Sequence, residues 1–127
     1  MFKDLLIVGF GSFIGGVTRY VTIQIIHKFI NTNFPLGTLV VNLLGCFLIG
    51  ILYGLFDKGS IMSAEIKLFL IVGICGGFTT FSSFTYETIS LVNDSEVLYL
   101  MVYMGMSIFT GISMTLIGKN IVDYFIR

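Results

Sequence analysis

The stretch G-I-C-G-G-F-T-T-F-S-S-F-T-Y-E, from Gly73 to Glu87, decides the fold of this chain. It lies in an apolar segment from about Ala64 to Leu91, which is long enough to cross a bilayer at ~20 residues per span. Its middle favours helix poorly, because Gly76-Gly77 lack side chains and the hydroxyls that follow compete for backbone partners. A broken helix is tolerated inside a membrane only where its freed N–H and C=O groups face protein, an ion or water. We therefore expect this span to break near the bilayer midplane and to form a binding site.

The residues around the expected break suit two kinds of ligand. Phe78, Phe81 and Phe84 recur every third residue, and Phe81 and Phe84 share a face where the helix resumes. Phenyl rings have a positive edge that can touch an anion, whereas carbonyls freed from Gly76 through Thr79 would hold a cation. A flexible, Gly-rich helix packed closely on a neighbour, with its phenylalanines facing lipid, explains the spacing equally well.

Composition places the whole chain in a membrane. Of its 127 residues 56% are hydrophobic and 11% are charged, against about 25% charged in globular proteins. A net charge of zero argues against nucleic acid as a partner. Cys46 and Cys75 both lie in apolar segments and imply no disulfide framework, and His27 alone cannot anchor a metal site. Because no nucleophile–base pair is present either, we expect no enzyme activity.

Four apolar segments are expected to cross the cell membrane as helices, over about residues 5–30, 35–56, 64–91 and 97–126. This predicts an all-α, multi-pass fold, with residues 1–127 as one four-helix transmembrane channel domain surrounded by lipid. In the first segment, Gly11-x-x-x-Gly15 and Ser12-x-x-x-Gly16 offer small faces for close helix contact. The stretch 57–62 is a predicted polar loop, 93–96 is a predicted turn, and Ser63 is predicted to cap the third helix.

Three spans carry polar side chains that need an explanation. Arg19 costs at least ~2.5 kcal/mol inside a span, so it either draws anions into a vestibule or pairs structurally. The carboxamide of Asn42, on one stripe with Thr38, must find a partner in hydrocarbon. It either bonds helices together, worth ~0.6 kcal/mol, or presents its NH₂ group to an anion, and the residues alone favour the first. Tyr103 and Ser107 share a face of the fourth span, and ordinary hydrogen bonding between helices also explains such residues.

Two other polar features lie near the ends of spans three and four. Glu87 is close to the far end of the third span, where a solvated carboxylate is favoured over a proton carrier. Gly111 follows Ser107 by one turn on the polar face of the fourth span and contributes no hydroxyl to it.

Several motifs together resemble one family. G-G-F-T-T-F-S-S-F closely resembles the signature of the Fluc (CrcB) fluoride channels, which are small four-helix membrane proteins, with Ser83 where the family often has threonine. P-L-G-T-L-V-V-N-L-L-G-C-F-L-I-G, beginning at Pro35, resembles the family's second-helix motif. Gly15-Gly16 followed by Arg19-Tyr20 is similar to its first-helix pattern.

The resemblance implies a fluoride-selective channel for passive efflux, which lowers fluoride toxicity in the cytoplasm. It reverses the preference at Asn42 and implies an anion path with Arg19 in its vestibule and these lining residues: Asn42, Phe81, Phe84, Ser107, Tyr103 and Thr38. It also implies an antiparallel (inverted) dimer, in which carbonyls of Gly76 and Thr79 from each copy surround a structural sodium ion at the dimer centre. Some relatives have a hydroxyl at Gly111, where Thr110 or water would substitute here.

Charge distribution bears on the partner. With both ends of the chain on one face, most basic residues lie on or near that face, namely Lys3, Lys58, Lys67, Lys119 and Arg127. The positive-inside rule then predicts one orientation, with both termini in the cytoplasm, whereas a dual-topology homodimer should show weaker bias. Either packing overrides the rule, or this chain pairs with a homologous subunit of opposite bias.

Two other functions compete with the channel. A small multidrug-type, proton-coupled exporter subunit also forms antiparallel dimers, but it needs a mid-membrane carboxylate in the first helix, where this chain has Arg19. A non-transporting assembly subunit is favoured only if the Phe and Asn positions prove indifferent.

Overall fold

The computed structural model describes residues 1–59 and 63–127. Over this part of the chain, four helical runs are long and apolar enough to cross a membrane, so the all-α prediction with four spans is confirmed. The first run is α1 (Phe2–Phe29) and the second is α2 (Leu36–Asp57), which begins one residue after Pro35. The third run contains α3 (Ala64–Lys67), the π-helical segment η1 (Leu68–Cys75), α4 (Gly76–Phe78) and α5 (Phe81–Asn93). The fourth contains α6 (Val97–Gly105), the π-helical segment η2 (Met106–Thr110) and α7 (Gly111–Phe125).

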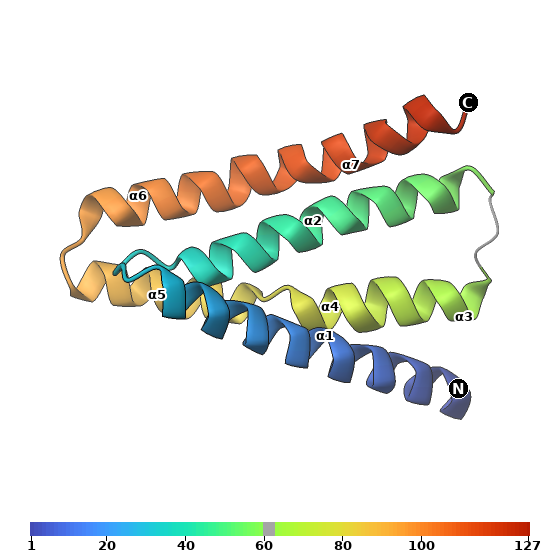
Figure 1. Ribbon diagram of the computed structural model, residues 1–127, viewed down its shortest axis with the longest axis horizontal. Helices are drawn as coiled ribbons and strands as arrows, with labels where there is room; N and C mark the ends of the chain where they lie inside the picture. Colours follow the sequence, from blue (N-terminus) through green and yellow to red (C-terminus); the bar gives the residue numbers. More distant parts are fainter. Residues whose placement is uncertain (60–62) are drawn as a thin grey trace.

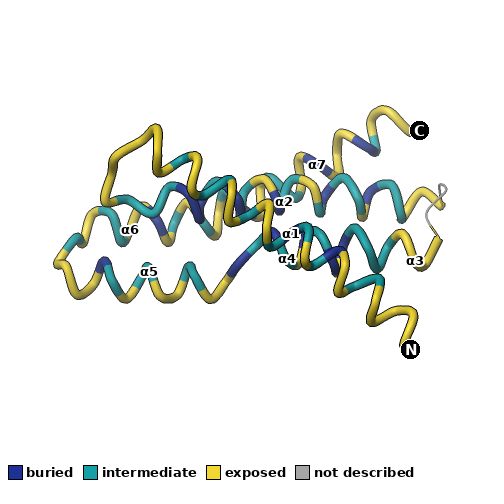
Figure 2. The backbone as a smooth tube through the Cα atoms, turned by 60° about the horizontal axis from the view of Figure 1, so that its bottom comes forward, coloured by how far each residue is buried: buried dark blue, intermediate teal, exposed yellow. Residues whose placement is uncertain are grey.

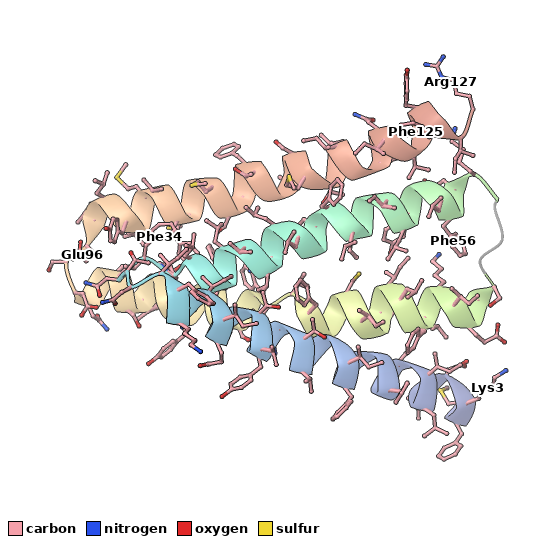
Figure 3. All side chains as sticks on the ribbon, in the orientation of Figure 1. Lys3, Phe34, Phe56, Glu96, Phe125 and Arg127 are labelled. Carbon is pink, nitrogen blue, oxygen red and sulfur yellow. The ribbon has the colours of Figure 1, made fainter. Side chains whose placement is uncertain are left out.

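The runs lie side by side, with α2 between the α6–α7 run and the third run, and with α1 crossing the third run at α4 (Figure 1). Both marked ends of the chain lie at the end of the bundle where α2 leads to α3. Lys3 and Arg127 lie at this end, whereas Phe34 and Glu96 lie at the other (Figure 3). Lys58 and Lys119 are also near this end, because they pair with Asp123 of α7 and with Asp57 at the end of α2.

Glycines bring α1 against the third run. A Cβ atom at Gly15 would collide with the carbonyl oxygen of Ile74, and one at Gly11 would lie 2.9 Å from the Cα atom of Gly73. On the neighbouring face, a Cβ atom at Gly77 would lie 2.6 Å from the carbonyl oxygen of Ser12. The backbones thus approach closely, as the small-residue stripes predict.

Glycines also allow close packing between α2 and α7. A Cβ atom at Gly50 would collide with the carbonyl oxygen of Thr115, and one at Gly118 would collide with that of Phe47. Away from these contacts, the tube in Figure 2 is mostly half-buried or exposed. Many large apolar side chains are therefore exposed on the surface of the bundle rather than packed in an internal core.

A small apolar core lies where α2, α5 and α6 meet. It contains Leu39, Leu91 and Tyr103, which is 0% exposed, and Phe84 packs against it. This core fixes α5 after the third run leaves α4, and so it positions the aromatic side of the candidate site.

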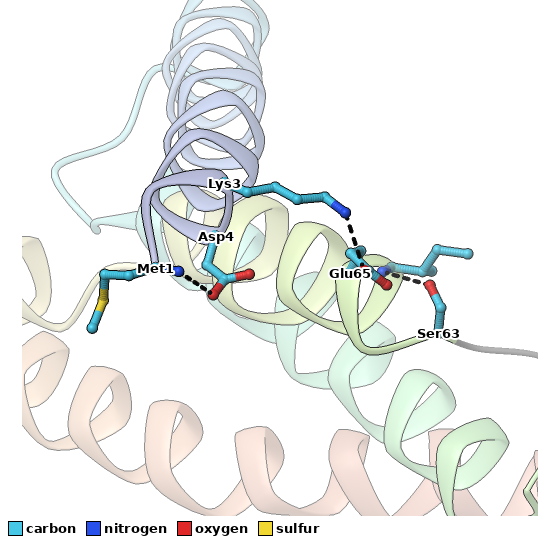
Figure 4. A network of polar contacts seen from close by, with 6 residues as sticks. Met1, Lys3, Asp4, Ser63 and Glu65 are labelled. Atoms are coloured by element: carbon cyan, nitrogen blue, oxygen red, sulfur yellow. Dashed lines mark hydrogen bonds and ion pairs between the residues drawn. The ribbon is translucent and has the colours of Figure 1, made fainter.

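Polar contacts lie at the end of the bundle where the two chain ends are. Ser63 accepts a hydrogen bond from the Ile66 N–H at 3.3 Å, so the predicted cap is confirmed, and Lys3 bonds to Glu65 at 3.3 Å (Figure 4). Of the predicted polar loop over 57–62, Asp57 is the last residue of α2, and residues 60–62 lie outside the described residues. The predicted turn at 93–96 is confirmed between α5 and α6.

Candidate functional site: an uncharged cavity beside an extended linkage

The helical path of the third run is interrupted at Thr79 and Thr80. Thr79 has φ −86° and ψ 157°, and Thr80 has φ −150° and ψ 118°, which is extended backbone between α4 and α5. The glycine pair Gly76-Gly77, which favours helix poorly, is itself helical, so the interruption begins two residues later, at Thr79. The physical reason is packing: the face of Gly77 is held against the α1 backbone at Ser12, so this glycine provides close contact rather than unwinding.

Asn42 supports the extended linkage from α2. Its side-chain oxygen accepts a bond from the Thr80 N–H at 2.8 Å, and its NH₂ group donates to the Thr80 carbonyl at 3.0 Å. Thr80 is 7% exposed, so without Asn42 both of these backbone groups would lack a protein partner in a buried position. Asn42 therefore does bond two spans together, and one N–H of its NH₂ group remains for another partner.

Thr80 also starts α5. Its hydroxyl oxygen accepts a bond from the Ser83 N–H at 3.1 Å, which is the geometry of a helix N-cap. The extended residues Thr79 and Thr80 are thus held by the Asn42 side chain of α2 and by the N-cap bond of Thr80 to α5.

The carbonyl groups of Gly76 and Thr79 depart from the regular helical hydrogen-bond pattern. The Thr80 N–H, which would close the helical bond to the Gly76 carbonyl, donates to Asn42 instead. The Thr79 carbonyl accepts a bond from the Arg19 guanidinium at 3.1 Å. Arg19 therefore pairs structurally with the linkage, as one of its two predicted roles requires.

A cavity of about 500 Å³ lies beside the linkage, between α2, α5 and the fourth run. Asn42, Phe81, Phe84 and Ser107, all predicted site residues, line it together with Thr80. Every described residue that lines it is uncharged. The Ser107 hydroxyl oxygen is fully buried and has no hydrogen-bond partner within the described chain. A buried hydroxyl of this kind calls for a ligand or a water molecule.

The aromatic side of the cavity is continuous with the core. The ring centroids of Phe81 and Phe84 are 5.6 Å apart, and those of Phe84 and Tyr103 are 5.2 Å apart. Phe81 is 76% exposed although it lines the cavity, whereas Phe78, the first phenylalanine of the repeat, is buried. Only the two later rings are thus placed to border a ligand.

Thr38 and Tyr103, two further predicted site residues, lie outside this cavity and bind Glu87. The Thr38 hydroxyl donates to one carboxylate oxygen and the Tyr103 hydroxyl to the other, each at 2.6 Å. A hydroxyl has one proton, so neither is free to donate to an anion in this arrangement. Glu87 is half-buried rather than a solvated carboxylate at the surface, because α2 and α6 both bring a hydroxyl to it.

Two residues at the site were not predicted from the sequence. These are Thr80, which begins α5, and Glu87, which accepts from two hydroxyls. Thr80 stands three residues before Ser83 at the start of an amphipathic helix, which is a recognisable capping pattern. No local pattern places Glu87, because its partners come from 49 and 16 positions away in the sequence.

Comparison with known proteins gives a consistent result. Residues 6–119 match the family described as CrcB-like protein, Camphor Resistance (CrcB). Relatives named fluoride-specific ion channel FluC include one from Flavobacterium psychrophilum, 40% identical over 91% of this chain and 94% of the relative. Another, from Chlorobium phaeobacteroides, is 46% identical over 94% of this chain and 93% of the relative. A third, from Azobacteroides pseudotrichonymphae, is 42% identical over 98% of this chain and 100% of its own length. With four apolar spans as well, the chain belongs to the CrcB-like family and is a multi-pass protein of the plasma membrane.

Proposed function

We propose that this protein is a fluoride-selective channel that lets fluoride leave the cytoplasm passively and so limits its toxicity. The observation that carries the proposal is the uncharged cavity lined by Asn42, Ser107 and the rings of Phe81 and Phe84. The Ser107 hydroxyl oxygen, at this wall, is buried without a hydrogen-bond partner among the described residues. Neutral donors and positive ring edges suit a small anion. The choice of fluoride among anions rests on the relatives named fluoride-specific ion channel FluC.

The donors that the described part of one chain brings to the cavity are too few to offset the cost of moving fluoride into the membrane. A charge in hydrocarbon costs on the order of ten kcal/mol, and a hydrogen bond to a charged group is worth about 1.5–3 kcal/mol. The remaining N–H of Asn42 and the hydroxyl of Ser107 therefore offset about 3–6 kcal/mol together. A complete pathway needs further donors, and a second subunit supplies them.

The partner is a second copy or a homologous subunit inserted in the opposite direction. Thr79 and Thr80 stand in the middle of the 30-residue run Ala64–Asn93, so their linkage lies near the bilayer midplane. Equivalent groups at the midplane are the ones that an inverted copy brings together, because the two-fold axis then lies in the membrane plane. Membrane lipid covers the remaining apolar faces.

A sodium ion at the centre of that dimer fits the carbonyl groups of Gly76 and Thr79. The Thr80 N–H is bonded to Asn42 rather than to the Gly76 carbonyl, and a carbonyl oxygen has a second lone pair beyond the one that Arg19 occupies at Thr79. Two neutral ligands are too few for a hard cation, so both subunits contribute. The Arg19 guanidinium donates to the same Thr79 carbonyl, and its charge would oppose the cation. An ion held there would link the two extended segments and would add a positive field to the site.

The proton-coupled exporter is less well supported. Such a protein needs a titratable carboxylate in its binding cavity, and the described lining residues are uncharged. Glu87 lies outside the cavity, with both carboxylate oxygens bonded to hydroxyls. The relatives' names also describe a channel and not an exporter or an enzyme.

Fluoride efflux from liposomes tests the proposal, followed with a fluoride electrode. We expect Phe81→Ile to reduce the efflux strongly, because it removes a ring edge from the cavity. Phe125→Ile is a matched control, since Phe125 is 77% exposed near the end of α7 and does not line the cavity. Equal efflux from the two variants would remove the ring from the pathway.

A further inference from the structure

A second groove lies away from the candidate site, along the seam between α1 and the start of the third run. Its volume is about 390 Å³, and Glu65 lines it together with five apolar residues, namely Leu6, Ile7, Phe10, Ile66 and Phe69. Leu6, Phe10 and Ile66 are exposed, so the groove is open to whatever surrounds the bundle. We call it the seam groove.

The seam groove lies at the depth where lipid headgroups meet the acyl chains. Thr79, which is near the midplane, follows Phe69 by 10 residues and Glu65 by 14. At about 1.5 Å per residue, Phe69 and Glu65 are up to about 15 and 21 Å from the midplane. The hydrocarbon of a bilayer ends about 15 Å from its midplane, and the headgroup region ends about 20–22 Å from it. The polar end of the groove is therefore among the headgroups, whereas Phe69, stacked on Phe10 with ring centroids 6.1 Å apart, borders the acyl chains.

An ion pair stands at the polar end of the groove. The Lys3 Nζ atom lies 3.3 Å from the Glu65 carboxylate, so the pair crosses the seam from α1 to α3 (Figure 4). Lys3 is one turn before Ile7, and Glu65 is one turn before Phe69. Both charged side chains are exposed, and the ammonium group has three N–H donors, of which this contact uses one. The pair can therefore bind a further charged group.

The charges at this end suit a zwitterion better than an anion. Glu65 and Asp4 both bring a carboxylate close to Lys3 (Figure 4). Lys67 does not add a second cation, because its Nζ atom is directed to α2 and lies 3.9 Å from the centroid of the Phe56 ring. An anionic headgroup would thus meet a carboxylate together with the Lys3 ammonium. A headgroup that carries a phosphate and an ammonium group can pair with both members of the ion pair.

We propose that the seam groove binds phosphatidylethanolamine. The phosphate accepts from the Lys3 ammonium, and the ethanolamine ammonium donates to the Glu65 carboxylate, so that four charges alternate in sign. The upper part of an acyl chain lies in the groove between Phe10 and Ile66. Phosphatidylcholine has no N–H group to donate, because its nitrogen carries three methyl groups, and phosphatidylglycerol has no cation for Glu65. For one charged contact at a membrane surface, the preference over these two lipids is about fivefold.

Native mass spectrometry tests the proposal on the full chain in detergent, with equal amounts of the three lipids carrying identical acyl chains. We expect the wild type to retain phosphatidylethanolamine about fivefold more than either competitor. Lys3→Gln should lower the bound phosphatidylethanolamine about fivefold. Glu65→Gln leaves only the cation, so phosphatidylglycerol should then be retained at least as well as phosphatidylethanolamine. Lys58→Gln is the matched control, because Lys58 pairs with Asp123 at 3.5 Å and does not line the groove.

Three outcomes would overturn the proposal. Equal retention of phosphatidylethanolamine and phosphatidylcholine by the wild type would remove the headgroup contact. A preference of the wild type for phosphatidylglycerol would mean that the site is cationic and does not select a zwitterion. A Glu65→Gln or Lys3→Gln variant that melts within a few degrees of wild type and keeps the wild-type preference would place the lipid elsewhere on the surface. Each result is read from bound lipid and is independent of fluoride efflux, so the channel proposal is tested separately.

Discussion

Removal of the Asn42 side chain gives the sharpest structural prediction. Asn42→Ala deletes both hydrogen bonds that hold the Thr80 backbone, at 2.8 and 3.0 Å. An unsatisfied buried polar group costs about 1–3 kcal/mol, so two such groups at a residue that is 7% exposed set an upper limit of about 6 kcal/mol. Interhelical hydrogen bonds in membranes average only ~0.6 kcal/mol, and water from the adjacent cavity can bond to Thr80. We therefore expect a loss of about 2–4 kcal/mol.

Denaturation in detergent micelles measures this loss. Asn120→Ala is the matched control, because Asn120 is exposed near the end of α7 and an exposed substitution costs within about 0.5 kcal/mol. We expect Asn42→Ala to be clearly less stable than Asn120→Ala. Equal stability would refute the claim that the α2 amide holds the linkage, even if fluoride flux changed.

Three further predictions follow from other contacts. Gly15→Ala places a Cβ atom against the backbone of Ile74 and should lower the free energy of unfolding by about 1–3 kcal/mol in the same assay. Gly16→Ala meets nothing within 4 Å and should leave stability unchanged. Equal losses in the two variants would contradict the close contact between α1 and the third run. Glu87→Gln should lower the free energy of unfolding by about 1–3 kcal/mol, because an NH₂ group replaces one of the two oxygens that accept from Thr38 and Tyr103. An unchanged melting temperature would contradict this prediction. Orientation reporters fused to the chain should detect both orientations if the partner is a second copy; one orientation with full activity from this chain alone would exclude the inverted homodimer.

The spans and their contacts follow from local features of the sequence. Apolar length predicts the four spans, and the small-residue spacing of Gly11 and Gly15 predicts which face of α1 packs closely. Ser63 is recognisable as a cap because its hydroxyl acts on a residue only three positions away. Each of these signals is read within a few turns of one helix.

The site depends on contacts that no local pattern contains. The glycine pair suggests a break at Gly76, but the close contact of Gly77 with α1 accompanies a helical pair. Asn42, 38 residues from Thr80, accepts the backbone hydrogen bond where the helix ends. Likewise, Thr38 and Tyr103 are donors by residue type, yet their hydroxyls donate hydrogen bonds to Glu87 and not to the cavity. The single domain over residues 1–127, the inverted dimer and the sodium ion stay predictions.

Selectivity between anions tests the central claim most directly. Liposomes that contain this chain are loaded with equal concentrations of fluoride and chloride, and the release of each ion is followed by a selective electrode after a potassium ionophore is added. We expect rapid release of fluoride, with chloride retained as in protein-free liposomes. Release of chloride at a rate comparable to fluoride, or retention of both ions, would contradict it.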